Sequence, residues 1–444
     1  MDEIHTESLA LFSKPLIYSG IEKKYFTEYR SFSQLDIKKP LEFQIPGNTQ
    51  DYVDLSQSKL FLKLKLKRGD GSPMETKDYA CPINIPLHTI WGNVELSLNQ
   101  TVVSNTNSTY AHLAYLDALF EKRGQMDAAD SEMFALDRYD AWSSEYPRKI
   151  TVPVAVAGVV PPHIVVRGGL EERNTWVQGG STFDVVGHLR TDFCKQKRLI
   201  PNGVPIRLKL FPQTTPFMVL ADNGVSKAYS IELEDAVLSV CHVTLHPAVI
   251  LAHEKFLKEN SNALYPYYRS ELLRYTVPSN QFTATIESPF NGEIPKVVYV
   301  MFVGEDAYNG SYIKSPFNFK HYDLSEASIT VDGLPFPTRG LHLDFDNDLY
   351  TEAHNALLDT IKRHEGNPDP VIDRKMFKEG YTILAFDLSS VLGSEDIFFT
   401  PKRKGHLRIN LRFNKKTPEY INVLVVAKFP DLVQIDASRN CLKD

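Results

Sequence analysis

Four side chains near the middle of the chain are the strongest candidates for metal chemistry: His242, His246, His253 and Glu254, in the segment CHVTLHPAVILAHE. Imidazole and carboxylate groups are common zinc ligands. On an extended strand, however, His242 and His246 share one face at a separation of about 13 Å, at ~3.3 Å per residue. One ion cannot bridge that separation unless the strand bends at Pro247, and the spacing differs from HExxH. The segment therefore predicts structural or exposed residues and no metal site.

Two further patterns resemble ligand-binding motifs only in part. Asp344, Asp346 and Asp348 (DFDND) alternate as in a calcium loop, but the glycine and the closing glutamate are missing. The run Lys402-Arg403-Lys404 is compatible with a solvated loop, a nuclear-import signal or contact with an acidic partner. No GxSxG or Walker A motif occurs, and the other histidines have no evident triad partners. The sequence thus predicts a protein that is not an enzyme and binds no cofactor.

Composition restricts the class of protein. The chain has 444 residues, 43% of them hydrophobic and 23% charged, with a formal net charge of −6. This length allows two domains of about 200 residues each. The modest charge disfavours general nucleic-acid binding, which depends on clustered basic residues. The four cysteines form no CxxC pair, which predicts reduced thiols. Neither a signal peptide nor a membrane-spanning stretch is expected.

The two halves of the chain contain the same series of predicted elements. In each half, two short strands joined by a polar turn precede a helical stretch that begins with tyrosine. The strands and turn lie in Trp91–Ser104 (turn Asn99-Gln100) and Leu324–Phe336 (turn Asp332-Gly333), and the helical stretches are Tyr110–Phe120 and Tyr350–Ile361. Such a repeat predicts two tandem copies of one domain.

A second pair of landmarks supports the duplication. Gly203–Leu220 and Gly405–Lys428 share an alternating strand, a Thr-Pro step and an apolar strand. Leu60–Leu66 (LFLKLKL) alternates with the period of a strand that buries one face. Short strands separated by turns predict an all-β sandwich. The helix that follows the hairpin in each copy fits two tandem jelly-roll β-sandwiches with short helices in loops. The expected domains are an N-terminal arm at 1–35, a first jelly roll at 36–222 and a second at 223–444.

Other segments yield weaker expectations. Val152–Val160 and Ile164–Val166 are candidate strands, and Met126–Trp142 is expected to be irregular or helical. The aromatic arm at 1–35 either orders against a neighbour or straps its own domain. The aromatic loop Ala307–Tyr322 likewise packs under its own domain or against a neighbour, because aromatic rings are costly to leave in water.

Several long segments resemble a known family. They are Val303–Leu324 (VGEDAYNGSYIKSPFNFKHYDL), His246–Leu257 (HPAVILAHEKFL), Gln434–Asn440 (QIDASRN) and Trp91–Phe120. The chain resembles, over most of residues 30–444, the double jelly-roll major capsid (hexon) protein of Polinton/Maverick virus-like transposons and adintoviruses. The resemblance carries no catalytic, cofactor or metal residue.

The resemblance implies a structural role. Three chains would form a pseudo-hexagonal homotrimer that tiles an icosahedral shell around double-stranded DNA, without reading a specific nucleic-acid sequence. Expected partners are neighbouring capsomers and penton or minor capsid proteins, and the expected location is a virion assembled in host cytoplasm or nucleus. The alternatives are a carbohydrate- or receptor-binding jelly-roll module, and a cupin-like metal enzyme whose ligand set the sequence does not supply. The candidate inter-subunit contacts are Tyr308, Tyr312, Phe317, Phe319, Tyr322, Tyr25 and Phe26.

Overall fold

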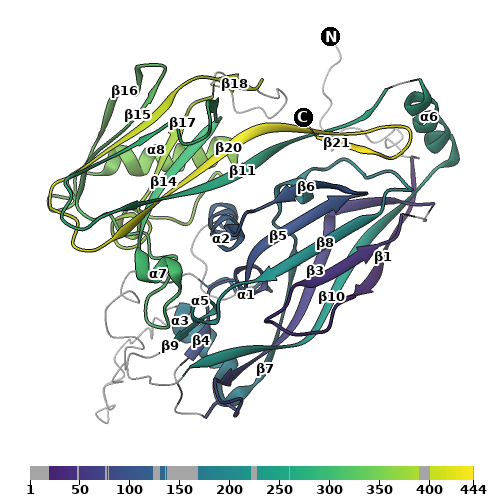
Figure 1. The fold of residues 1–444 in the computed structure, drawn as a ribbon, viewed down its shortest axis with the longest axis horizontal. Helices are drawn as coiled ribbons and strands as arrows, with labels where there is room; N and C mark the ends of the chain where they lie inside the picture. The colour runs from purple at the N-terminus through teal and green to yellow at the C-terminus, as the bar shows by residue number, and fades with distance from the viewer. Residues whose placement is uncertain are drawn as a thin grey trace, which may run out of the picture.

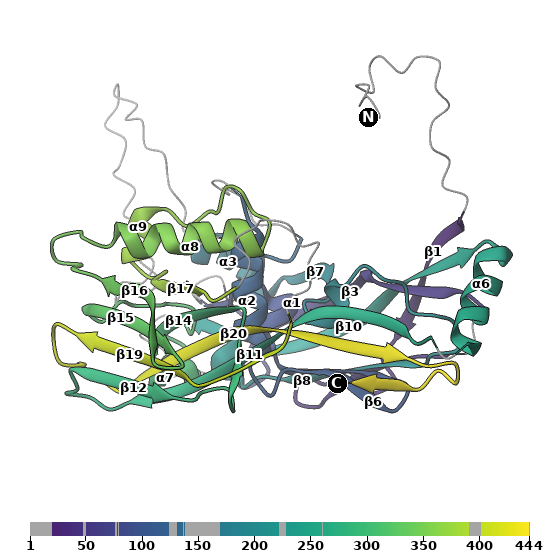
Figure 2. The same cartoon turned by 90° about the horizontal axis from the view of Figure 1, so that it is seen from above.

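The structure is a computed structural model. It describes residues 20–47, 50–75, 78, 80–123, 131–135, 137, 169–221, 228–259, 261–389 and 401–443. The two predicted strands within 152–166 and the predicted arm residues 1–19 lie outside these ranges, as does most of 126–142. Over the described residues the chain forms two barrels that lie side by side (Figures 1 and 2).

The first barrel consists of two four-stranded antiparallel sheets. One sheet has the order β1-β10-β3-β7, made of Ile21–Arg30 (β1), Tyr229–Leu245 (β10), Tyr52–Arg68 (β3) and Thr182–His188 (β7). The other has the order β2-β8-β5-β6, made of Leu41–Ile45 (β2), Ile206–Pro212 (β8), Trp91–Leu98 (β5) and Thr101–Asn105 (β6). Alternating strands bury their apolar residues between the two sheets, as in a sandwich.

The second barrel repeats this strand order. One sheet is β11-β20-β14-β17, made of Ala263–Val277 (β11), Ile421–Ile435 (β20), Val297–Gly304 (β14) and Ile383–Asp387 (β17), and Cys441–Lys443 (β21) extends it beside β20. The other is β12-β19-β15-β16, made of Thr283–Glu287 (β12), Leu407–Phe413 (β19), Leu324–Val331 (β15) and Leu334–His342 (β16). Each barrel therefore places its eight strands in the same relative order along the chain, and the prediction of two tandem jelly rolls is confirmed.

Short elements decorate the loops. Two-stranded pairs join Ala80–Pro82 (β4) to Val219–Ala221 (β9) and Glu293–Ile294 (β13) to Arg403–Lys404 (β18). The helices are Pro86–Thr89 (α1), Tyr110–Glu121 (α2), Gly169–Val177 (α3), Asp192–Lys195 (α4), Thr215–Met218 (α5), Pro247–Lys258 (α6), Glu305–Asn309 (α7), Thr351–His364 (α8) and Arg374–Lys378 (α9). No helix among the described residues is long and apolar enough to cross a membrane.

The predicted repeat of hairpin and helix is present in both barrels. In the first it is β5, β6 and α2, and in the second β15, β16 and α8. Asn99 has a φ of 57°, and Asp332 and Gly333 have φ values of 50° and 82°, in the left-handed region that tight hairpin turns require. The predicted buried face of β3 is also correct, since Leu60, Leu62, Leu64 and Leu66 are all buried.

The predicted boundary between residues 222 and 223 lies one strand too early. β10 pairs with β1 and β3 along its length, so Tyr229–Leu245 completes the first barrel. The sequence analysis correctly matched the two halves of the chain at β8 and β19. In the first barrel, however, α5 and β9 intervene before the final long strand. In the second barrel β20 follows β19 with no such insertion. The barrels are instead joined through α6, between β10 and β11.

The predicted arm also needs correction over its second half. Ile21–Arg30 is strand β1, which pairs with β10 from Ile21↔Leu245 to Arg30↔Val237. Tyr29 packs against the first barrel's core, which holds this strand in the sheet. Because β1 pairs with β10 alone, it is the edge strand of that sheet.

Candidate functional site

The residues that suggested a metal site are separated in the structure. His242 is buried on β10, where its Nε2 lies 3.2 Å from the Tyr29 hydroxyl. His246 caps α6 and accepts a hydrogen bond at Nδ1 from the Ala248 N–H. His253 lies 3.1 Å from the Tyr52 hydroxyl, and Glu254 forms an ion pair with Arg439. Each side chain thus has its own protein partner.

The acidic triple is likewise divided among different partners. Asp344 accepts from the Asn347 side chain at 2.8 Å, Asp346 pairs with Lys415 at 3.1 Å and Asp348 with Lys378 at 2.5 Å. Across the part of the chain that the structure describes, no three His, Cys, Asp or Glu side chains gather in a way that could hold a metal ion.

The basic run belongs to the second barrel's surface. Lys402 pairs with Asp431 at 3.3 Å, and the Arg403 guanidinium donates to the Leu388 carbonyl at 3.0 Å. Arg403 and Lys404 form β18. The use of the run Lys402-Arg403-Lys404 as a nuclear-import signal stays a prediction.

The aromatic loop packs largely against its own chain. Phe317 and Phe319 are buried, and Phe317 stacks on Tyr115 of α2 with ring centroids 4.0 Å apart and planes 3° apart. Tyr308 stacks on His112, also of α2, at 5.0 Å. Internal packing therefore accounts for the centre of this loop, and Phe317 and Phe319 are enclosed by their own chain.

The remaining predicted contact residues are less buried than Phe317 and Phe319. The Tyr312 hydroxyl donates to the Tyr229 carbonyl at 3.3 Å, and the Tyr322 hydroxyl donates to Glu419 at 2.9 Å. Tyr25 is half-buried, with its hydroxyl 2.6 Å from Asp51 and its ring stacked on His242. Of the seven, Phe26 presents the most open ring, since 55% of its surface is exposed.

The aromatic loop and α2 together form a junction between the barrels. α2 follows β6 of the first barrel in sequence, yet its Tyr115, Leu119 and Phe120 belong to the hydrophobic core of the second. Phe120 lies against Tyr299 of β14, with ring centroids 4.9 Å apart. The helix is therefore an apolar plug shared by both barrels, and its burial opposes their separation.

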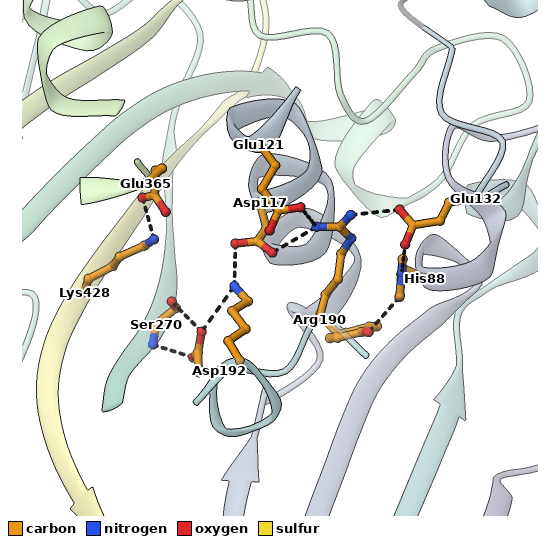
Figure 3. Close-up of polar contacts among 11 residues, drawn as sticks. His88, Asp117, Glu121, Glu132, Arg190, Asp192, Ser270, Glu365 and Lys428 are labelled. Carbon is orange, nitrogen blue, oxygen red and sulfur yellow. Dashed lines mark hydrogen bonds and ion pairs between the residues drawn. The ribbon is translucent and has the colours of Figure 1, made fainter. Parts of the chain in front are cut away.

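A charged cluster borders this plug on the side of α4 and β11 (Figure 3). The Arg190 guanidinium donates to three carboxylates: Asp117 at 3.2 Å, Glu121 at 2.6 Å and Glu132 at 2.8 Å. Lys195 of α4 also donates to Asp117. Two cations thus lie among three carboxylates from α2 and a neighbouring loop, so the cluster carries an excess of negative charge when all three are ionised.

Burial and pairing set the ionisation of the cluster. Burial raises the pKa of Asp117, but Lys195 and Arg190 outweigh it and hold that pKa at about 2. Burial also raises the pKa of Glu132, but His88 and Arg190 hold it at about 2. Burial lowers the pKa of His88, whose Nδ1 lies 2.9 Å from the Tyr110 hydroxyl. At neutral pH the two carboxylates are therefore charged and the imidazole is neutral.

The cluster crosses to the second barrel through Asp192 of α4. Its carboxylate accepts from the backbone N–H and the hydroxyl of Ser270 on β11, at 2.6 and 3.0 Å. Beside it, Lys428 of β20 donates to Glu365 at 2.5 Å, and Figure 3 shows this pair facing Asp117. These bonds fix the register of β11 against the first barrel.

Asn367 of the second barrel completes the helix end at the junction. Its side-chain amide donates to the carbonyls of Phe120 at 2.8 Å and Lys122 at 2.7 Å, two acceptors at the C-terminus of α2. Helix ends leave such carbonyls without intrahelical partners. A residue from one barrel thus caps a helix from the other.

We expect Asn367→Ala to lower the free energy of unfolding by about 1–3 kcal/mol, because it leaves these buried carbonyls unsatisfied. Thermal unfolding and hydrogen exchange at residues 118–121 measure the effect. Asn347→Ala, at an exposed turn, is the matched control and is expected to be near neutral. Unchanged exchange at the end of α2 in Asn367→Ala would contradict the capping role.

The C-terminal hairpin ties the barrels a second time. Thr101 donates to the Cys441 carbonyl at 2.9 Å, and Lys443 donates to the Val103 carbonyl at 3.1 Å. The buried Tyr267 hydroxyl of β11 donates to the same Val103 carbonyl at 3.2 Å. β20 and β21 therefore extend over the first barrel's β6, while α2 enters the second barrel. The two barrels are therefore joined at two places, by α2 and by the β20–β21 hairpin.

The junction holds the two barrels side by side. Its carboxylates are paired with cations, its histidine is buried, and its bonds join structural elements. Sequence reasoning did not find it, because its members come from segments far apart in the chain: Arg190 and Asp117 are separated by 73 residues and Asp192 and Ser270 by 78. The one available signal was the aromatic loop, whose rings required a partner.

Comparison with known proteins agrees with the observed fold. No protein-family model matches the chain. An uncharacterized protein of Caenorhabditis elegans is 26% identical over 417 residues, which cover 91% of this chain and 93% of that protein. The two chains are thus similar over nearly their whole lengths.

Solved structures with the same fold come from viral capsids. A chain of the Sputnik virophage has a TM-score of 0.62 at 12% identity, with 99% of this chain and 92% of that chain covered. The mavirus major capsid protein has a TM-score of 0.52 at 12% identity, with 99% and 93% covered. The Faustovirus major capsid protein has a TM-score of 0.52 at 8% identity, with 98% and 93% covered. At these identities the similarity establishes the double jelly-roll fold.

Proposed function

We propose that this chain is the major structural subunit of an icosahedral capsid, a protein without enzymatic activity that functions in a virion. The observation that carries the proposal is the pair of jelly rolls with identical strand order, locked side by side by an exchanged helix and hairpin. The double jelly-roll fold shared with the mavirus and Faustovirus major capsid proteins supports it. The resemblance to Polinton/Maverick and adintovirus capsid proteins supports that lineage.

The geometry suits a trimeric building block. Three copies of a two-barrel chain present six similar barrels, and their near six-fold outline packs hexagonally. Sandwiches of this kind also limit the exposed strand edges at which chains aggregate. The proposed partners are two further copies of the chain, then neighbouring capsomers and penton or minor capsid proteins.

A closed three-fold ring requires two different surfaces on each copy, because its contacts are head-to-tail. Strands β1 and β16 lie at opposite ends of the molecule (Figure 1), and exposed apolar side chains lie on or next to each of them. The β1 patch contains Phe26 and Phe32, which are 55% and 80% exposed, and the β16 patch contains Leu334 and Phe336, which are 73% and 42% exposed. We propose that the β1 patch of one copy contacts the β16 patch of the next. Phe26 thereby keeps its predicted role at a subunit contact.

We expect Leu334→Asp to weaken trimer formation at least about tenfold, because it places a charge in an apolar contact. Phe26→Asp is expected to act in the same way from the other side of the contact. Phe282→Asp is the matched control, since Phe282 is also exposed but adjoins β12, at the opposite edge of the sheet from β16. Light scattering across a dilution series gives the trimer fraction. Equal effects of all three substitutions would contradict the assigned patches.

Electron microscopy of the expressed protein tests the proposal as a whole. Shells, or particles with a pseudo-hexagonal outline and three-fold symmetry, are the expected result. A dispersed monomer that binds glycans at micromolar concentration would instead favour a carbohydrate-binding module.

A further inference from the structure

The helix that joins the two barrels leaves an apolar groove beside it. α6 runs from Pro247 to Lys258, and of its residues only Leu257 is buried. Between α6, the end of β10 and the start of β11 lies a groove of about 440 Å³. Its lining includes Leu245, Phe256, Leu264 and Tyr265. The side chains of Phe256 and Leu264 are 61% and 46% exposed. Apolar surface of this kind is normally covered by a partner.

The first described residues of the chain lie beside the groove. The described residues begin at Gly20, whose carbonyl accepts from the His246 N–H at 3.0 Å, at the first turn of α6. The next residue, Ile21, pairs with Leu245, which lines the groove. Figure 2 shows the start of β1 beside α6. The described part of the chain therefore begins at the edge of this groove.

The composition of the segment before Gly20 fits an apolar groove. Residues 9–18 read LALFSKPLIY, in which Ser13 and Lys14 are the polar exceptions. Ten extended residues reach up to about 33 Å. A helix of 12 residues such as α6 is about 18 Å long. The segment is thus long enough to cover the groove from end to end.

We propose that residues 9–18 of the same chain dock in the groove between α6 and β11. A short tether gives the segment an effective concentration in the millimolar range, far above that of a second copy in dilute solution. Docking would bury Phe256 and Leu264 and would strap the linker helix to the first barrel. This inference does not depend on the proposed capsid function.

Site-directed cross-linking tests the docking in the full chain. Leu11→Cys is combined with Ser261→Cys, since Ser261 is exposed and lines the groove, while the four natural cysteines are buried. A short bismaleimide is expected to join the two positions within one chain, at a rate independent of protein concentration. The matched control pairs Leu11→Cys with Phe282→Cys, an exposed position outside the groove and outside both proposed contact patches, where no cross-link is expected.

A further substitution tests the apolar contact. Phe256→Asp, added to the Leu11→Cys and Ser261→Cys pair, is expected to slow the cross-link at least about tenfold, since it removes an aromatic contact that docking would bury. Circular dichroism verifies that each variant is folded. Absence of the cross-link in the folded pair, or a cross-link that joins two chains, would overturn the proposal, and the trimer measurements above are independent of either result.

Discussion

Replacing Arg190 with alanine is expected to lower the melting temperature at pH 7 by roughly 5–15 °C. The side chain is 10% exposed and donates to Asp117, Glu121 and Glu132. Removing one partner of a buried ion pair typically costs about 3–5 kcal/mol, because the other charge is left without compensation. Here three carboxylates lose their shared cation, and Lys195 remains for Asp117 alone.

The size of this effect is expected to depend on pH. Asp117 and Glu132 have a pKa of about 2 in the folded protein, below the ordinary values of these groups. Their charged forms therefore stabilise the fold above the ordinary pKa, and this contribution is lost as the pH falls toward about 2. Without Arg190, protonation relieves the repulsion among the carboxylates. The difference in melting temperature between wild type and Arg190→Ala is thus expected to shrink between pH 7 and pH 4.

Arg408→Ala is the control for this prediction. Arg408 forms an ion pair with Glu287 at 2.9 Å, but both side chains are about half exposed, at 48% and 52%. Exposed pairs contribute little, so the melting temperature should change by no more than about 2 °C. Equal losses from Arg190→Ala and Arg408→Ala would contradict a stabilising role for the buried cluster.

Phe317→Ala is expected to lower the free energy of unfolding by about 3–5 kcal/mol. Phe317 is almost completely buried, stacks on Tyr115 and packs edge-on against Phe217 and His112. Deleting the ring leaves a cavity where α2 meets the aromatic loop. Because α2 is shared by both barrels, the amides of Tyr110–Glu121 should also exchange with solvent faster than in wild type.

Phe282→Ala provides the comparison, since Phe282 is an exposed ring outside the junction. It should change the free energy of unfolding by no more than about 0.5 kcal/mol. If Phe317→Ala destabilised the protein but left exchange at α2 unchanged, the loop would be a local packing element and would not couple the barrels.

The parts of the fold that the sequence predicted are those with local signals. The turns at Asn99 and Asp332-Gly333, the alternation in Leu60–Leu66 and the tyrosine-led helices are each encoded within about a dozen residues. Their recurrence indicated two copies of one β-rich domain before any strand pairing was known. Phe26 lies on an exposed face, and its contact with a neighbouring subunit stays a prediction.

The remaining features depend on contacts between distant segments. β9 resembles a closing strand in composition, and only the pairing of β10 with β3 assigns Tyr229–Leu245 to the first barrel. Nothing near Asp117 indicates that Arg190 will approach it, or that α2 will leave its own barrel for the core of the next. Buried ion pairs between loops are set by tertiary packing, which composition and periodicity do not encode.

The histidine and aspartate side chains that were considered as metal ligands lie apart for a related reason. His253 and Glu254 face different partners, and Asp346 and Asp348 are bound by Lys415 and Lys378. A lectin-like calcium loop would require those carboxylates to converge on one point. Polar residues at the junction, such as Asp192 and Ser270, instead join the two barrels.

The mass of the purified protein in solution tests directly whether the chain forms the proposed trimer. One chain has a mass of 50.4 kDa, so size-exclusion chromatography with light scattering should give about 151 kDa, three times that value. A stable trimer of this mass is expected at micromolar concentration, with Leu334→Asp reducing it toward monomer. A mass near 50 kDa for the wild-type chain across the whole concentration range would contradict the proposed trimer.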